Sequence, residues 1–172
     1  ICRQGLAAIP NYKELESPGV ASLIHETARA YFFNDMPDKA LPLCQHALDL
    51  ARRLGLVEVQ AETLATLGVL PNQSSEDALQ ALLQAVELSE SAGLLASVVR
   101  AHTNLGTHLQ NIGEYISARE HLMRSREVAH QLGIPDWEHT MLANVVDICF
   151  LLGDLVYIQT VVAELNELRS EE

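Results

Sequence analysis

The sequence predicts an all-α protein made of repeated helix pairs, and three observations carry this prediction. First, Leu and Ala dominate a chain of 172 residues that is 48% hydrophobic and only 5% aromatic, which favours small-on-large helix packing. Second, no run of Val, Ile and Thr alternates cleanly with polar residues between turn signals, as a strand would. Third, Gly55, Gly93 and Gly133 recur 38 and 40 residues apart, each at the end of an amphipathic segment.

Small residues recur in register with these glycines. Each glycine stands where the end of a helix favours a left-handed backbone conformation. Small residues occur eight and fifteen positions before each glycine, on one helix face where a neighbouring helix can approach closely. They are Ala47, Ala85 and Ser125, and Ala40, Ala78 and Ala118. Gly68 and Gly106 also recur, each after a Leu, and Ala28 and Val146 occupy the matching places in the first and last repeats.

Turn signals divide each repeat into two helices. Pro, Gly, Asn and Asp gather at residues 35–38, 71–74, 111–114 and 153–154. The second turn ends with Ser74, a good helix N-cap that carboxylates follow. We therefore expect residues 1–17 to be a leader or the end of a preceding helix, and residues 18–172 to be four helix pairs, at about 18–56, 57–94, 95–134 and 135–172. The predicted core includes Leu64, Leu67, Leu82, Val86, Leu105, Leu109, Leu122, Val128 and Val145.

The charge balance argues against nucleic acids and membranes as partners. The formal net charge is −12, and Arg52-Arg53 is the largest basic cluster. Nucleic-acid binding needs a basic stripe, and anionic lipids would repel this chain. No apolar stretch is long enough for a transmembrane helix. Three widely spaced cysteines and the absence of a signal peptide indicate buried or incidental thiols in a fragment of a larger cytoplasmic protein.

Motifs of catalysis and of metal binding are missing. The segment His25-Glu26-Thr27-Ala28-Arg29 begins like a zinc-protease helix but has Arg where the second His ligand must stand. The other histidines lack Cys or carboxylate partners at ligand spacing. No phosphate-binding loop, dinucleotide fingerprint or nucleophile elbow occurs. We therefore expect neither enzyme activity, nor a cofactor, nor a metal site.

The repeats resemble those of tetratricopeptide repeat (TPR) proteins, whose pattern is Trp-x2-Leu-Gly-x2-Tyr, then Ala-x3-Phe, then Pro. Two features depart from that pattern: the period is 38 to 40 rather than about 34 residues, and Gly-Leu or Gly-Ile replaces the final Pro. Longer repeats of this kind are similar to those of bacterial LuxR/MalT-like or STAND ATPase-linked signalling regulators, and to those of eukaryotic polarity scaffolds. The matching residues are Tyr31, Ala40, Leu67, Gly68, Ala78, Leu105, Gly106, Tyr115 and Ala118.

The resemblance implies a right-handed superhelical α-solenoid of antiparallel helix pairs, in which the first helix of each pair lines a concave groove. Asn104 and Asn144 stand one repeat apart, and in related proteins an asparagine at this place clamps the backbone of an extended peptide. An amide suits that task because it donates and accepts hydrogen bonds together. The alternative is that both are solvated polar residues. The predicted groove residues are Arg29, Phe33, Glu62, Thr66, Arg100, Thr103, Asn104, Thr107, Gln110, Asn111, Asn144 and Asp147.

Two functions follow as expectations. The first is a non-catalytic module that binds a protein or peptide within a signalling or transcription-regulatory protein. The second is an arm that senses a small-molecule effector and regulates an attached ATPase, kinase, cyclase or DNA-binding domain. Phe32, Phe33 and Phe150 could form apolar pockets, although we expect at least one of them to pack in the core. The last helix should expose an apolar face that further repeats or self-association would cover; its residues are Val156, Val161, Val162, Leu165 and Leu168.

Overall fold

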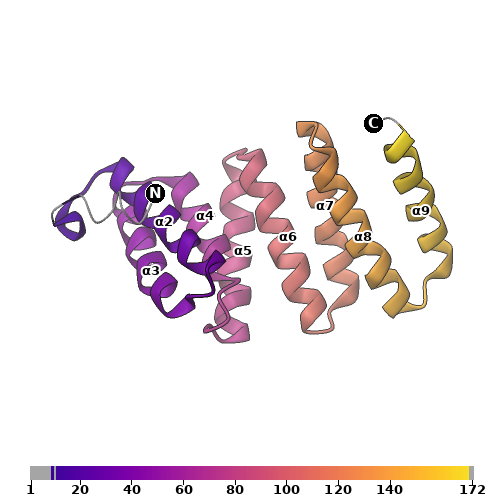
Figure 1. The fold of residues 1–172 in the computed structure, drawn as a ribbon, viewed down its shortest axis with the longest axis horizontal. Coiled ribbons are helices and arrows are strands. Elements are labelled where there is room, and N and C mark those ends of the chain that lie inside the picture. The colour runs from indigo at the N-terminus through magenta and orange to yellow at the C-terminus, as the bar shows by residue number, and fades with distance from the viewer. Residues whose placement is uncertain (1–8, 10, 171–172) are drawn as a thin grey trace. The chain divides into compact units, whose positions relative to one another are not determined.

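The structure, a computed structural model, describes residue 9 and residues 11–170, and within this part every regular element is helical (Figure 1). Its elements are a 3-10 helix η1 (Tyr12–Glu14) and the helices α2 (Pro18–Phe33), α3 (Pro37–Arg53), α4 (Val57–Leu67), α5 (Ser75–Ser91), α6 (Leu95–Asn111), α7 (Tyr115–Leu132), α8 (Pro135–Leu152) and α9 (Leu155–Ser170). None of the described helices is both long and apolar enough to cross a lipid bilayer.

The chain divides into two compact units, one up to Ser97 and one from Val98 onward. In the first unit α2 packs against both α3 and α4, and α4 packs against α5. The buried cluster between α2 and α3 contains Val20, Ala21, Ile24, Ala47 and Leu50. In the second unit α7 lies against α8, and α8 lies against α9. Val98 and Val99 of α6 form a buried cluster with Val128 and Ala129 of α7.

The predicted glycine ends of the helices are confirmed. Gly55, Gly93 and Gly133 have φ angles of 67°, 65° and 66°, in the region that glycine enters at little cost. At each of them the residue after the glycine donates its N–H to the carbonyl five positions before itself; Leu56, for example, donates to Ala51 at 2.9 Å. This is the Schellman arrangement, in which an apolar residue follows the glycine. The Gly-Leu and Gly-Ile pairs thus end these helices where the TPR pattern has Pro.

Gly68 and Gly106 serve a different purpose, which is close packing between helices. A Cβ at Gly106 would lie 2.8 Å from Cγ of Leu122 and 2.9 Å from its Cδ2. A Cβ at Gly68 would lie against Leu82 in the same way and 3.0 Å from the carbonyl of Ala78. The recurring small residues predicted to permit this approach are all buried: Ala40, Ala47, Ala78, Ala85, Ala118 and Ser125.

The predicted core is buried except at one position. Val86 is only half-buried, whereas the other eight side chains are at most 8% exposed: Leu64, Leu67, Leu82, Leu105, Leu109, Leu122, Val128 and Val145. The expectation that one of three phenylalanines packs in the core is wrong. Phe33 and Phe150 are each 72% exposed, and Phe32 is half-buried.

The apolar face expected on α9 requires one correction. Val161 is 1% exposed, because this side of α9 faces the body of its own unit, where α8 packs against it. Val156 and Val162 are exposed, at 77% and 42%. Leu165 is half-buried, and Leu168 lies outside the residues whose side chains the structure describes.

Candidate functional site

The predicted groove residues fall into two sets, one in each unit. The second unit holds the larger set, on α6 and α8. Thr107, Asn111 and Asp147 are exposed there. The half-buried members are Arg100, Thr103, Asn104, Gln110 and Asn144. This set forms a polar, partly open face, which we call the amide face because asparagine and glutamine are its commonest residues.

Thr103 joins the helices behind the amide face. Its hydroxyl donates to the carbonyl of Val99 at 2.8 Å and lies 2.8 Å from the hydroxyl of Ser125 on α7. The indole Nε1 of Trp137 on α8 donates to the same Thr103 oxygen at 3.3 Å. The sulfur of Met141 is also 3.3 Å away. Thr103 therefore holds α6, α7 and α8 together, and its hydroxyl is engaged within the protein.

These contacts place the two asparagines on neighbouring helices. Asn104 directly follows Thr103, and Asn144 lies about one helical turn after Met141, which touches Thr103. The residue after each asparagine, Leu105 or Val145, is 0% exposed. Each asparagine therefore lies at the edge of the core: its side chain is partly exposed to solvent, and the residue that follows it is buried.

The smaller set lies on α2 and α4 in the first unit. Arg29 donates to both carboxylate oxygens of Glu26, at 3.0 and 3.2 Å, and its guanidinium lies 5.9 Å from the ring centroid of Phe33. Thr66 is only 4% exposed, so it lies beneath the surface rather than on it. Glu62 is partly exposed and points its carboxylate toward His25.

His25 is the centre of a polar cluster that sequence reasoning missed. Its ring is 1% exposed, and Nε2 lies 3.2 Å from the hydroxyl of Thr66. Nδ1 lies 3.6 Å from a carboxylate oxygen of Glu26 and 3.6 Å from one of Glu62. Residue spacing along α2 cannot reveal this cluster, because Glu62 and Thr66 come from α4. The available signal was that Glu62 and Thr66 both belong to the predicted groove residues, and that His25 and Glu26 lie within one helical turn of Arg29, another of them.

A second pair of histidines meets between α6 and α7. Nδ1 of His102 and Nδ1 of His121 are 2.9 Å apart, and His102 is 4% exposed. One of the two nitrogens must carry a proton for this contact to be a hydrogen bond. Spacing within each helix could not reveal the pair, since its members belong to different helices.

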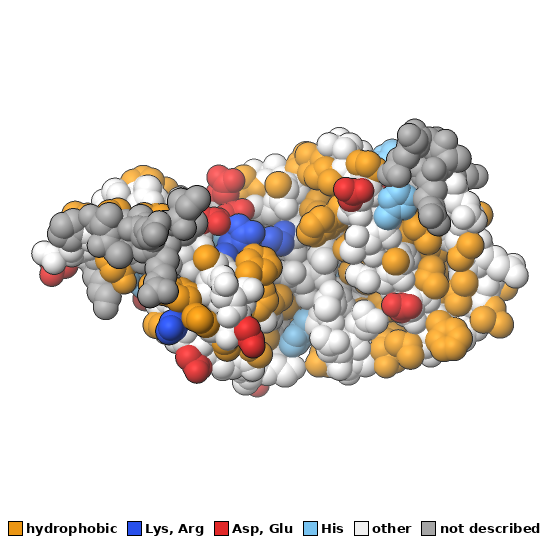
Figure 2. All heavy atoms as spheres, in the orientation of Figure 1, with side chains coloured by type: hydrophobic (Ala, Val, Ile, Leu, Met, Phe, Trp, Pro, Cys, Tyr) orange, Lys and Arg blue, Asp and Glu red, His pale blue; other side chains and the backbone are white. Residues whose placement is uncertain are grey.

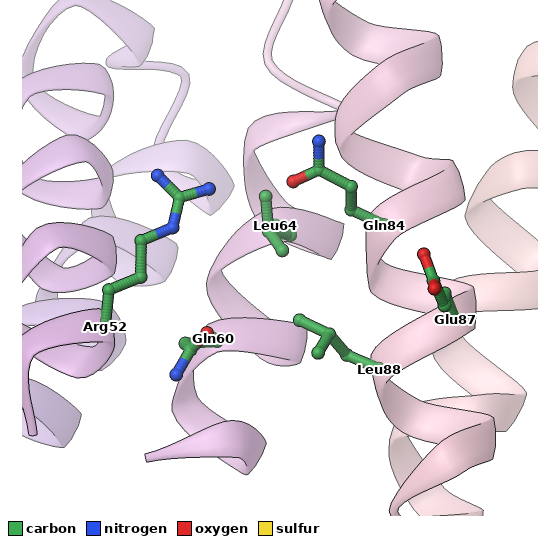
Figure 3. Close-up of a pocket in the computed structure, with 6 residues that line it drawn as sticks. All are labelled: Arg52, Gln60, Leu64, Gln84, Glu87 and Leu88. Atoms are coloured by element: carbon green, nitrogen blue, oxygen red, sulfur yellow. The ribbon is translucent and has the colours of Figure 1, made fainter. Parts of the chain in front are cut away.

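A small recess lies between α3, α4 and α5 in the first unit (Figure 3). Its volume is about 280 Å³, just under the roughly 300–1,000 Å³ of typical small-molecule sites. Arg52 and Glu87 stand on opposite sides, and Leu64 and Leu88 lie between them. No predicted groove residue belongs to it, as its lining shows: Arg52, Gln60, Leu64, Gln84, Glu87 and Leu88.

Exposed hydrophobic side chains gather around the turn between α8 and α9 (Figure 2). Phe150 and Leu151, at the end of α8, are 72% and 54% exposed. Leu155 and Val156, at the start of α9, are 65% and 77% exposed. We call these four residues the C-terminal apolar patch. Such a cluster is typical of a surface that contacts another protein surface.

No protein-family model matches this chain, and no curated protein matches it. Several solved protein structures do match it. The apo form of RapI aligns with 99% of this chain and 46% of its own at 13% identity and a TM-score of 0.78. BtubC from P. vanneervenii aligns with 99% of this chain and 71% of its own at 20% identity and a TM-score of 0.82. A Podosopora anserina putative kinesin light chain with nearly identical TPR-like repeats aligns with 99% of this chain and 84% of its own, at 17% identity and a TM-score of 0.66.

This chain spans less than half the length of the RapI structure that it matches. At these identities the likeness concerns the fold alone. The alignments cover nearly the whole chain, and all described regular structure is helical. The chain therefore has the all-α fold of TPR-like helical-repeat proteins.

Proposed function

We propose that this chain is a non-catalytic binding module whose amide face takes an extended peptide segment of a protein partner. The observation that carries the proposal is the pair Asn104 and Asn144, half-open amides on adjacent helices, each followed by a fully buried residue. A peptide backbone offers one donor and one acceptor per residue, which one amide side chain can match. Rigid helices keep these amides in place, so little entropy is lost on binding.

The fold supports the same proposal by analogy. One solved structure of this fold, 14% identical with a TM-score of 0.78, is a Rap protein complexed with competence and sporulation factor. We propose that the present chain acts within a larger cytoplasmic regulator of signalling or transcription, of the long-period repeat type found beside LuxR/MalT-like or STAND ATPase modules. Its net charge of −12 favours a basic or neutral peptide over nucleic acid or an anionic membrane.

Trp137 provides a direct assay because it is the only tryptophan in the chain and donates a hydrogen bond to Thr103 behind the amide face. Peptides selected from a random displayed library are titrated while the tryptophan emission is recorded, and calorimetry gives the affinity. Asn104→Ala and Asn144→Ala should each weaken binding about 5- to 100-fold, since each leaves a peptide group without its partner. Alanine is also the better helix former at both positions, so folding should be retained.

Asn72→Ala is the matched control, since Asn72 is an exposed asparagine outside the amide face. The affinity of the Asn72→Ala variant for each selected peptide should equal that of the unmodified chain. If Asn104→Ala and Asn144→Ala bind every selected peptide as tightly as the control does, the amides do not clamp a peptide and the proposal is wrong.

The recess between α3 and α5 favours a second function, the sensing of a small effector. Arg52 and Glu87 on opposite sides of an apolar floor suit a small zwitterion or a polar metabolite. Thermal shifts with a set of amino acids and other cytosolic metabolites test this function. A shift that Leu83→Ala, at an exposed leucine of α5 outside the recess, preserves and that Arg52→Gln and Glu87→Gln abolish would support effector sensing; shifts that survive both charge-removing variants would exclude this recess.

We further propose that the C-terminal apolar patch is covered by protein, either by further repeats of the longer chain or by a second copy. Light scattering should show a mass that rises with concentration for this chain. Leu155→Glu with Val156→Glu should remain monomeric, because two charges then occupy the patch. Leu83→Glu is the control, since Leu83 is an exposed apolar residue on α5 and not a member of the patch, at 43% exposure. A mass that stays monomeric in the unmodified chain at every concentration rules out self-association.

A further inference from the structure

We propose that His25, Glu26 and Glu62 form a binding site for a divalent transition-metal ion, best suited to Zn²⁺, in the first unit of the chain. Nδ1 of the histidine and one carboxylate oxygen from each glutamate all lie within 4.8 Å of one another. Two ligands come from α2 and one comes from α4. A bound ion would therefore join two helices that belong to successive repeats.

Hydrogen bonding determines which histidine nitrogen faces the carboxylates. The hydroxyl of Thr66 donates to the backbone carbonyl of Glu62 at 3.0 Å, so its single proton is used there. Its oxygen then accepts from Nε2–H of His25, 3.2 Å away. In neutral His25 the proton is thus on Nε2, and Nδ1 carries the lone pair. Metal-ligating histidines are commonly fixed in this way, with the second ring nitrogen donating to a nearby acceptor.

The separations suit ligands arranged around an ion. Nδ1 lies 3.6 Å from Oε1 of Glu26 and 3.6 Å from Oε2 of Glu62. A tetrahedral ion with bonds of about 2.0–2.1 Å holds neighbouring ligand atoms about 3.4 Å apart. Small side-chain adjustments would therefore bring all three atoms to bonding distance.

The charges of the two carboxylates and their exposure to solvent also favour a bound metal ion. Two carboxylates meet beside a nearly fully buried imidazole, and a cation between them would offset their mutual repulsion. The side chains of Glu26 and Glu62 are 44% and 30% exposed, which leaves a path for the ion and room for water as a further ligand. One imidazole and two carboxylates with an open position make a donor set that Zn²⁺ accepts.

Arg29 should lower the affinity of this site for a metal ion. Its guanidinium binds both oxygens of Glu26, at 3.0 and 3.2 Å, and so orients that carboxylate. It also competes with the ion for the same negative charge. Replacing it with an uncharged residue should therefore tighten metal binding, whereas a merely structural role of the cluster predicts no binding to tighten.

The test uses the full chain, stripped of metal with a chelator and then titrated with ZnCl₂ by calorimetry and with Co²⁺ by visible absorption. We expect one ion per chain at this site and a rise in melting temperature of about 5–10 °C at a hundredfold excess over the dissociation constant. Tetrahedral Co²⁺ should give intense visible bands. Glu62→Gln, a change of the same shape at a partly exposed position, should weaken binding at least about tenfold, because even the loss of a residue that only supports a metal ligand costs about 10- to 100-fold.

Three further variants make the result specific. His25→Asn should abolish binding, although burial of the ring requires a check of folding by circular dichroism. Arg29→Gln should bind Zn²⁺ more tightly than the unmodified chain does. His121→Asn is the matched control, because it breaks the other close histidine contact, that with His102, and should leave the Zn²⁺ affinity unchanged.

Two outcomes overturn the proposal: no saturable Zn²⁺ binding by the unmodified chain, or Zn²⁺ binding that Glu62→Gln keeps in full. The amide face lies in the other unit, so peptide binding and metal binding are measured on different residues and can fail separately.

Discussion

Gly106 is predicted to be a packing glycine, and replacing it with alanine should destabilise the protein through a specific contact with Leu122. The new Cβ would lie 2.8 Å from Cγ and 2.9 Å from Cδ2 of that leucine, and 3.1 Å from the carbonyl of Ala118. Carbon atoms in good contact are about 3.5–4.0 Å apart. Leu122 is 0% exposed, so it cannot turn into solvent to make room.

The magnitude follows from two opposing terms. Overpacking a tight core costs about 1–3 kcal/mol, and two overlapping carbon atoms place this case in the upper part of that range. Alanine is the better helix former by about 1 kcal/mol. The net loss should be about 1–2 kcal/mol, which lowers the melting temperature of a chain of this size by about 2–8 °C. Thermal denaturation followed by circular dichroism measures this fall in melting temperature.

A double-mutant cycle with Leu122→Ala tests the cause. Leu122→Ala alone should cost about 2–5 kcal/mol because it leaves a cavity. In that background Gly106→Ala should become neutral or stabilising by up to about 1 kcal/mol, a coupling of about 1–3 kcal/mol. Gly55→Ala is the control: a Cβ there meets nothing within 4 Å, and the cost of about 1 kcal/mol comes from its left-handed backbone alone. Zero coupling between Gly106 and Leu122 would refute the packing explanation.

Three other predictions concern single residues. Ser74→Ala should cost about 1 kcal/mol in denaturant titration, because the hydroxyl accepts from the N–H of Asp77 at 3.1 Å as a helix cap; an unchanged midpoint would contradict the cap. Asp35→Gly should stabilise the chain by up to about 1 kcal/mol, since Asp35 has a φ of 55° where the third and fourth repeats place Gly113 and Gly153; a lower melting temperature would contradict this. Burial raises the pKa of the Cys44 thiol from 9.0 to about 12, so the free energy of unfolding should fall as the pH rises from 9 toward 12. Alkylation of Cys44 at pH 9 should therefore require unfolding, and rapid alkylation of the folded chain would contradict this prediction.

The fold was predictable because its main signals are local or periodic. Gly55, Gly93 and Gly133 could be placed from spacing alone, since a left-handed helix end is a property of one residue and its neighbours. Small residues such as Ala47 and Ala118 could be assigned to packed faces because the helical period fixes which positions share a side.

The candidate site was less predictable, because its contacts join different helices. Thr66 was expected in an open groove, but its side chain is buried and accepts from His25. Val161 was expected on an exposed face, but it points into its own unit. The period of a helix gives the direction of each side chain relative to its neighbours in the chain. It does not give the rotation and depth at which that helix meets the next one.

The amino-acid sequence by itself determined an all-α chain of repeated helix pairs, the residues that end each helix, and most of the core, since these depend on backbone preferences and on hydrophobic periodicity. The tertiary structure alone decided that His25 meets Glu62, that Trp137 binds Thr103, and that His102 meets His121. Each of these contacts depends on the packing angle and the register of two helices. Those quantities are set by the summed shape of many side chains, which no short motif records.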